Sequence, residues 1–150
     1  MQDFLSLCRS RRSIRKYTNQ AVTDEQIEYM TRCALMSPSG KRVNPWEFFV
    51  TRDEAKIRPL SACRTYGSGM FQTATAAIVV AVDASLTDVW HFDAAIAAHN
   101  LLLAAEDCGL GACWCQVYGR YVDEENSKSA EQHVKEVLGI PENLTVVCII

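Results

Sequence analysis

A cluster of cations near the start of the chain is the first feature that could do chemistry. It comprises five of the 15 lysines and arginines in a sequence of net charge −3, namely Arg9, Arg11, Arg12, Arg15 and Lys16. The planar guanidinium of arginine binds phosphate or carboxylate through paired hydrogen bonds, and Ser13 adds a hydroxyl within the same segment. We interpret the cluster as a local anion site. The alternative is a solvated basic loop, or a short patch for nucleic acid or for targeting.

Two further segments combine small and polar residues. Pro38-Ser39-Gly40 lets the backbone approach a planar ligand closely, and Asn44, before Pro45-Trp46, offers a donor and an acceptor to a ring edge. On its own this segment is more typical of a polar turn. The second segment follows a glycine pair and contains Cys113, Trp114, Cys115 and Gln116.

Motifs of several common enzyme classes are missing from the sequence. Neither Gly109-x-Gly111 nor Gly67-x-Gly69 completes a dinucleotide-binding fingerprint, because the third glycine is absent from both. The histidines form no H-E-x-x-H motif and no serine lies in a G-x-S-x-G elbow, which gives a hydrolase little support. Cys113-x-Cys115 with Cys108 lacks the spacing of a metal site, so we expect buried structural thiols and no metal.

The elements that must position these segments alternate irregularly between helix and strand. Thr23-Asp24-Glu25-Gln26 has the form of a capping box, which predicts a helix to about Met36. A short continuous apolar run predicts a central strand covered on both faces at 76–82. We expect further helices at 3–9, 53–60, 88–108 and 126–138, the second of them weak because of Pro59, and further strands at 46–51, 111–115 and 145–150. This pattern indicates an α+β fold with one sheet.

The helix predicted at 88–108 is apolar around most of its circumference. A 150-residue monomer has little interior in which to hide such a helix on every side. It is therefore either a central core helix or a helix at a subunit interface, and its residues alone leave both open. We expect His91 and His99 to take part in the packing of this helix.

Composition sets the broader class. The chain has 150 residues, 49% of them apolar and 22% charged, which is typical of one globular domain spanning 1–150. Its acidic balance gives no reason to expect nucleic acid as a partner, and polar residues interrupt the longest apolar segment, so no membrane span is expected. Seven cysteines at uneven spacings and the absence of a secretory leader favour a reducing cytoplasm.

Taken in order, these segments resemble the nitroreductase family of flavoproteins over essentially the whole chain. The resemblance is carried by Arg11-Arg12-Ser13-Ile14-Arg15-Lys16-Tyr17, Ser37-Pro38-Ser39-Gly40 through Asn44-Pro45-Trp46, Asp93-x-Ala95-Ile96-Ala97-Ala98-x-Asn100-Leu101, and Gly109-Leu110-Gly111-Ala112-Cys113-Trp114. Each motif alone is weak, whereas the order and spacing of all four are specific. The resemblance implies an α+β fold with a central mixed or antiparallel sheet flanked by helices. It also implies a homodimer that holds two FMN molecules at its subunit interface, with the long helix in the dimer core.

The resemblance further assigns the cofactor contacts. The basic motif would hold the FMN phosphate and the pyrimidine edge of the flavin through Arg11, Arg12, Ser13 and Arg15, with Arg15 near N1 and O2 of the ring. A loop from the opposite subunit would contribute Pro38, Ser39, Gly40 and Asn44. The segment beside the isoalloxazine would contribute Cys113, Trp114, Cys115 and Gln116. No side chain is implied as a catalytic acid or base, and no metal is implied.

The implied function is that of an FMN-dependent oxidoreductase with NADH or NADPH as reductant. Hydride would pass through N5 of the flavin to a nitroaromatic, a quinone or a related small acceptor. One alternative is a flavin-dependent relative with another substrate, of the dehalogenating or flavin-destroying type, for which the stretch 62–72 is the candidate lid. The other alternative is a non-catalytic protein that binds FMN or another anion.

The sequence departs from the family pattern at three places. Arg42 stands where family members often have asparagine, and Asn44 where they often have glutamine. The family's last strand usually runs into a Gly-Tyr-Pro turn, followed later by a basic residue that also touches the phosphate, whereas this chain ends at Ile150. We therefore expect the chain to lack the family's C-terminal segment.

Overall fold

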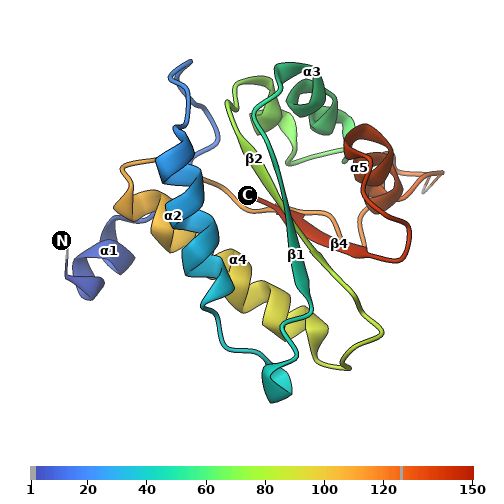
Figure 1. The fold of residues 1–150 in the computed structure, drawn as a ribbon. Coiled ribbons are helices and arrows are strands. Elements are labelled where there is room, and N and C mark those ends of the chain that lie inside the picture. Colours follow the sequence, from blue (N-terminus) through green and yellow to red (C-terminus); the bar gives the residue numbers. More distant parts are fainter. Residues whose placement is uncertain (1–2, 126) are drawn as a thin grey trace.

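A four-stranded antiparallel sheet lies at the centre of the computed structural model, which describes residues 3–125 and 127–150 (Figure 1). β2 pairs with β1 on one side and with β4 on the other, and β3 lies beyond β4. All six residues of β2 are buried, which confirms the prediction of a central strand covered on both faces. The strands are β1 (Trp46–Thr51), β2 (Ala77–Val82), β3 (Cys115–Gln116) and β4 (Thr145–Ile149).

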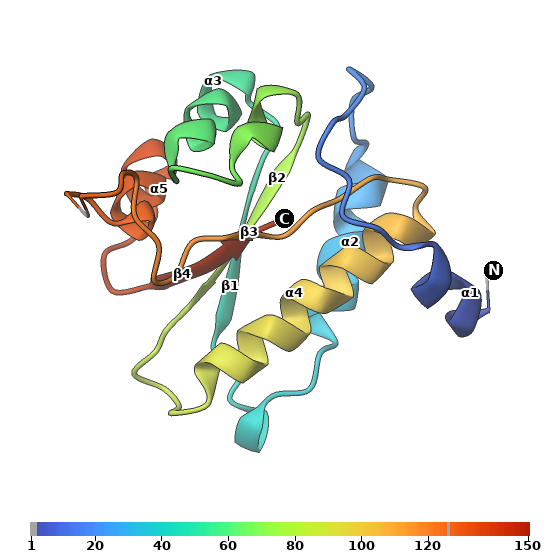
Figure 2. The ribbon, with the colours of Figure 1, turned by 180° about the vertical axis from the view of Figure 1, so that it is seen from behind.

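One face of the sheet is covered by short helices. Successive side chains of a strand point to opposite faces, so Ala77, Val79 and Ala81 of β2 share one apolar cluster. That cluster also holds buried residues of the helices that follow β1 and of the last helix. Figure 2 shows these helices together on one side of the sheet. These elements are α3 (Glu54–Ile57), the 3-10 helices η2 (Arg58–Ala62) and η3 (Gly69–Gln72), and α5 (Ala130–Leu138).

The opposite face is covered by the two longest helices, α2 (Asp24–Leu35) and α4 (Trp90–Asp107). Ile78, Val80 and Val82 of β2 pack against them in a second apolar cluster. The buried stripe of α4 is made largely of alanine, which lets this helix lie close to both the sheet and α2. Figures 1 and 2 show α4 passing beneath the sheet, with the short α1 (Phe4–Ser10) beyond its C-terminal half.

The helix ends follow the local sequence. The capping box predicted at the start of α2 is confirmed, because the Thr23 hydroxyl accepts from the Gln26 amide at 3.2 Å and the Gln26 side chain accepts from the Thr23 amide at 3.0 Å. Gly109 follows α4 with a φ of +72°, a left-handed conformation that glycine adopts without a steric penalty. The chain therefore turns sharply at this point, toward the Gly-Leu-Gly segment.

Three predicted boundaries are wrong. α5 begins at Ala130 because the Ser129 hydroxyl caps it, and Asn126, the predicted start, lies outside the described residues. The strand predicted at 111–115 is the two-residue β3, since Ala112 pairs with another part of the chain. The helix predicted at 53–60 changes to a 3-10 helix at Arg58, next to Pro59.

One expectation about packing is also wrong. His91 and His99 are exposed, because the buried side of α4 is formed by residues such as Ala94, Ala97 and Leu101, and the histidines fall on the opposite side of the helix.

The candidate lid at 62–72 is part core and part surface. Cys63, Met70 and Phe71 are buried in the core, whereas Tyr66 and Gly67 between them are exposed.

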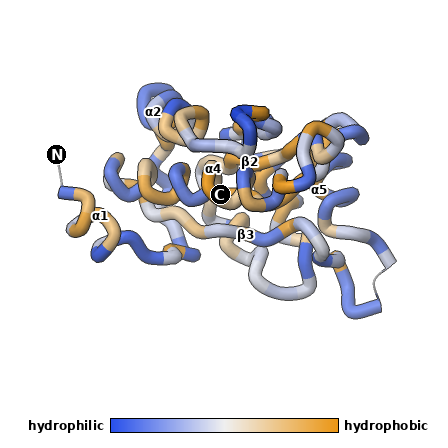
Figure 3. The backbone as a smooth tube through the Cα atoms, turned by 90° about the horizontal axis from the view of Figure 1, so that it is seen from below, coloured by the Kyte–Doolittle hydropathy of each residue, from blue (hydrophilic) through white to orange (hydrophobic). Residues whose placement is uncertain are grey.

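The apolar residues are unevenly distributed along the chain. Figure 3 shows apolar stretches gathered around β2 and α4, and α1 as a further apolar segment at the periphery. Within 3–125 and 127–150, no helix is both long and apolar enough to cross a bilayer.

Candidate functional site

Two segments nearly 100 residues apart meet at the C-terminal end of α4. Ser13 and Ala112 form an isolated parallel β-bridge, and the Ile14 amide donates to the Ala112 carbonyl at 3.0 Å. The bridge places the basic turn, defined here as residues 9–16, directly beside the segment 109–116. The structure therefore brings together two of the three segments that the sequence singled out.

The cations of the basic turn are available to a ligand. Arg12 and Arg15 are exposed and Arg11 is half-buried, and within the described parts of the chain no ion pair involves any of the five cations at 9–16. Arg12 has a structural task as well, because one of its guanidinium nitrogens donates to the carbonyls of Arg9 at 2.6 Å and Arg11 at 2.7 Å. Arg12 thus shapes the turn, while Arg11 and Arg15 are free to meet an anion.

The segment after Ala112 separates its side chains by alternation. Cys113 and Cys115 point into the core and are buried, whereas Trp114 and Gln116 point the other way and are partly exposed. The Trp114 indole donates to the Gln116 side-chain oxygen at 2.9 Å. Of these four side chains, only Trp114 and Gln116 reach the surface, and Trp114 also packs against the second apolar cluster.

Two of the three cysteines predicted to be buried structural thiols, Cys113 and Cys115, are buried, whereas Cys108 is only half-buried. A hydrogen bond with Cys63 lowers the pKa of the Cys115 thiol. A hydrogen bond with Cys115 and burial raise the pKa of the Cys63 thiol, and burial raises the pKa of the Cys148 thiol. Neither is ionised near neutral pH, which makes them poor nucleophiles. In the described part of the chain no three His, Cys, Asp or Glu side chains are grouped as metal ligands would be.

The third segment, the 37–44 loop, lies near the other end of α4. The Gly40 amide donates to Asp93 Oδ1 at 2.9 Å, and Asn100 donates to the Ser37 hydroxyl at 2.7 Å. From Asp93 to the end of α4 the helix rises by roughly 20 Å, at about 1.5 Å per residue. Within one chain, the predicted contacts Pro38, Ser39, Gly40 and Asn44 are therefore remote from the basic turn.

No role was predicted for Asp93 and Asn100 from the sequence, although both belong to the motif at 93–101 that carries the family resemblance. Their spacing of seven residues on one helix was the available signal, because residues seven apart lie on the same face. A buried aspartate and a half-buried asparagine on the same face of an otherwise apolar helix need polar partners there. The 37–44 loop supplies them.

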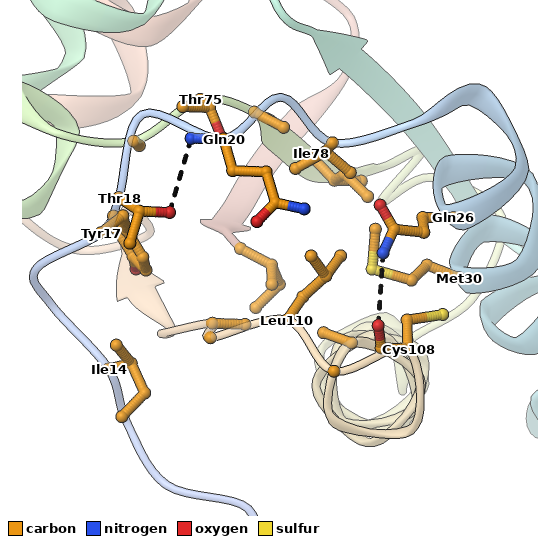
Figure 4. A pocket seen from close by; sticks show the side chains of 18 of the residues that line it. Ile14, Tyr17, Thr18, Gln20, Gln26, Met30, Thr75, Ile78, Cys108 and Leu110 are labelled. Carbon is orange, nitrogen blue, oxygen red and sulfur yellow. Dashed lines mark hydrogen bonds between the residues drawn. The ribbon is translucent and has the colours of Figure 1, made fainter.

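A cavity of about 440 Å³ adjoins the bridge on its inner side. It is bounded by residues 14–22, by the start of β2 and by the chain just after α4, and its wall includes Ile14, Leu110 and Ile150 (Figure 4). Gln26 closes one end by donating to the Cys108 carbonyl at 3.2 Å. None of the predicted cofactor contacts lines this cavity. The arginines of the basic turn therefore do not face it.

Comparison with known proteins shows which family the sequence matches. A family model described as the nitroreductase family matches residues 8–66 and 60–150. A protein of Archaeoglobus fulgidus, provisionally named an NADH dehydrogenase/NAD(P)H nitroreductase, is 38% identical over 154 residues, which cover 100% of this chain and 84% of its own length.

Solved structures share the fold. An FMN-dependent nitroreductase from Clostridium difficile R20291 superposes with a TM-score of 0.92 at 39% identity, over 97% of this chain and 84% of that chain. A protein from Desulfovibrio desulfuricans, provisionally named a nitroreductase and solved in complex with FMN, superposes with a TM-score of 0.79 at 28% identity, over 99% of this chain and 84% of that chain.

Proposed function

The chain belongs to the nitroreductase family, and from this premise we propose that it is an FMN-dependent oxidoreductase. It transfers hydride from NADH or NADPH to a nitroaromatic, a quinone or a related small acceptor. The observation that carries this proposal is the bridge between Ser13 and Ala112, which joins an arginine-rich turn to the segment that the family places beside the flavin.

The residues at the basic turn fit a phosphorylated cofactor. Arg11 and Arg15 have no carboxylate partner among the described residues, and Ser13 is exposed between them. Guanidinium groups and a hydroxyl are the donors that a phosphate group accepts from. Arg12 contributes by holding the turn in shape through its bonds to two backbone carbonyls.

The protein supplies orientation and charge to the reaction. Bound FMN would accept hydride from the nicotinamide and pass electrons to the second substrate. Arg15 would place its positive charge near N1 and O2 of the bound ring, which would favour negative charge developing there. Trp114 and Gln116, tied together by a hydrogen bond, give the neighbouring wall a fixed shape. No side chain is assigned as a catalytic acid, because water can protonate many acceptors.

We infer that the working unit is a homodimer. Phe92 and Ile96 lie on the outward side of α4 and are 62% and 40% exposed, and Phe4 of α1 is 70% exposed. Large apolar side chains left exposed on these two helices favour burial against a partner. A second copy on this surface also explains why the 37–44 loop is remote from the basic turn of its own chain, because the loop would then serve the flavin of the partner. The seven free cysteines fit a reducing cytoplasm as the site of action.

The test is anaerobic reduction of the FMN-loaded protein by NADH and by NADPH, followed by addition of a quinone. We expect at least one nucleotide to bleach the visible absorbance of the flavin and the quinone to restore it. If neither nucleotide bleaches the bound flavin, the protein is a non-catalytic flavin binder. A native mass equal to that of one chain would refute the homodimer.

A further inference from the structure

Asp93 is a buried carboxylate with an incomplete set of partners. Only 4% of the residue is exposed, and its Oδ1 accepts from the Gly40 amide at 2.9 Å. Its Oδ2 is buried and has no hydrogen-bond partner among the described residues. A buried carboxylate oxygen without a donor destabilises the fold, so the residue needs a reason other than stability.

Asn100 lies two helical turns further along α4 and faces the same loop. It donates to the hydroxyl of Ser37, which is buried. The two α4 side chains thus hold the loop at its first residue and again three residues later. Gly40 lies so close to the helix that a Cβ atom would stand 2.7 Å from Val89 Cγ2. The loop is therefore pressed against α4 and fastened there at two points.

The part of the loop beyond these anchors has an unfavourable backbone. Lys41, Arg42 and Asn44 have φ values of 54°, 60° and 51°, a left-handed region that residues with a Cβ rarely occupy. Inside the loop, the Ser39 hydroxyl donates to the side-chain oxygen of Asn44 at 2.7 Å. The same hydroxyl accepts from the backbone amide of Asn44 at 2.9 Å. Three such residues in four positions persist only where the surroundings fix them.

We propose that Asp93 and Asn100 are positioning residues that hold the 37–44 loop in the strained conformation in which it contacts the flavin of the partner subunit. This inference rests on the proposed function for the role of the loop, whereas the anchoring itself rests on the contacts of this chain. The oxygen of Asp93 that has no donor lowers the stability of the fold. The other oxygen of the same side chain holds the Gly40 amide.

The test compares three variants with the wild type. Asp93→Leu removes the acceptor and keeps the branching of the side chain, Asp93→Asn keeps an oxygen for the Gly40 amide without the charge, and Asp88→Leu is the matched control at an exposed aspartate near the same helix end. Each protein is measured without cofactor for its thermal midpoint and for tryptic cleavage after Lys41 and Arg42, which are both exposed. Each is then titrated with FMN.

We expect Asp93→Leu to raise the rate of cleavage after Lys41 and Arg42 and the Kd for FMN, each by about tenfold. Its thermal midpoint stays the same or rises, because a buried oxygen without a hydrogen-bond donor has been removed. Asp93→Asn and Asp88→Leu remain within about threefold of the wild type in both measurements. A residue with only a structural role would lower the thermal midpoint and leave the Kd of the folded protein unchanged.

The proposal is overturned if Asp93→Leu is cleaved at the same rate as the wild type and binds FMN with the same Kd. If Asp93→Leu does not fold, Ser37→Ala decides, because it removes the partner of Asn100 from the loop and leaves α4 intact. Several-fold faster cleavage of Ser37→Ala supports the anchoring, and an unchanged rate contradicts it. If the wild type binds no FMN, the proposed function fails, while the cleavage rates still test whether the helix anchors the loop.

Discussion

A Cβ atom built on Gly111 would lie 2.9 Å from Cγ2 of Ile14 and 3.1 Å from its Cβ. This approach is what allows the basic turn to run beside the chain after α4 and to form the bridge between Ser13 and Ala112. Rotation of the Ile14 side chain would not relieve the second contact, because its Cβ is fixed to the backbone. A glycine at position 111 is therefore a requirement of the site itself.

Replacement of this glycine should open the bridge. We expect Gly111→Ala to lower the free energy of unfolding by about 1–3 kcal/mol and to weaken FMN binding, since overpacking forces the two segments apart. The matched control is Gly69→Ala, because a Cβ at Gly69 meets no atom within 4 Å and the backbone there is not left-handed. Denaturant unfolding and FMN titration of both variants measure the difference. Equal effects at the two glycines would show that the close approach is unimportant.

Arg15 should affect the electronics of the bound flavin. Loss of its positive charge in Arg15→Ala removes stabilisation of the reduced ring, so the midpoint potential falls by about 30 mV or more, which corresponds to about 1.4 kcal/mol. Reduction by NAD(P)H slows accordingly. Arg15→Lys keeps the charge and should stay closer to the wild type in potential. A potential in Arg15→Ala that matches the wild type would remove Arg15 from this role.

Tyr17 should make the fold sensitive to alkali. Burial raises the pKa of Tyr17 from its ordinary value of 10.0 to about 12. The folded state therefore retains the phenol proton when the unfolded state has begun to lose it. This contribution to stability is fully present below pH 10 and is lost as the pH rises from about 10 to about 12. Tyr17→Phe should flatten the decline of the unfolding midpoint over this range, and an identical decline in both proteins would refute the assignment.

The thiols should differ sharply in their reactivity. Cys8 is exposed, whereas Cys63, Cys113, Cys115 and Cys148 are buried. We expect an alkylating reagent at mildly alkaline pH to modify Cys8 first in the native protein and to reach the buried four only after unfolding. Peptide mass mapping against time gives the order. Rapid native labelling of Cys113 or Cys115 would show that the segment 109–116 opens in solution.

The secondary structure of this chain was largely predictable because its signals are local. The capping box at Thr23 and the glycine after α4 each specify a helix end through a few neighbouring residues. The apolar run that became β2 needed no knowledge of its partners. The start of α5 was missed because the Ser129 cap lies after several polar residues that are equally compatible with a helix or a loop.

The arrangement of the candidate site was only partly predictable. The residue types of the basic turn indicated an anion site, but the bridge between Ser13 and Ala112 is a contact between distant parts of the chain that no local pattern contains. The outward histidines of α4 were misplaced for a related reason. Which side of an almost uniformly apolar helix faces the core is decided by the sheet and α2.

Binding of the FMN phosphate by the basic turn is tested by a paired titration. The wild type is titrated with FMN and with riboflavin, which differ by the phosphate group, and so is a variant that carries Arg11→Ala and Arg15→Ala. We predict that the wild type prefers FMN by about 100-fold or more, about 2.7 kcal/mol, and that the variant loses most of this preference. Equal binding of FMN and riboflavin by the wild type, or no binding of either, would contradict this role of the basic turn.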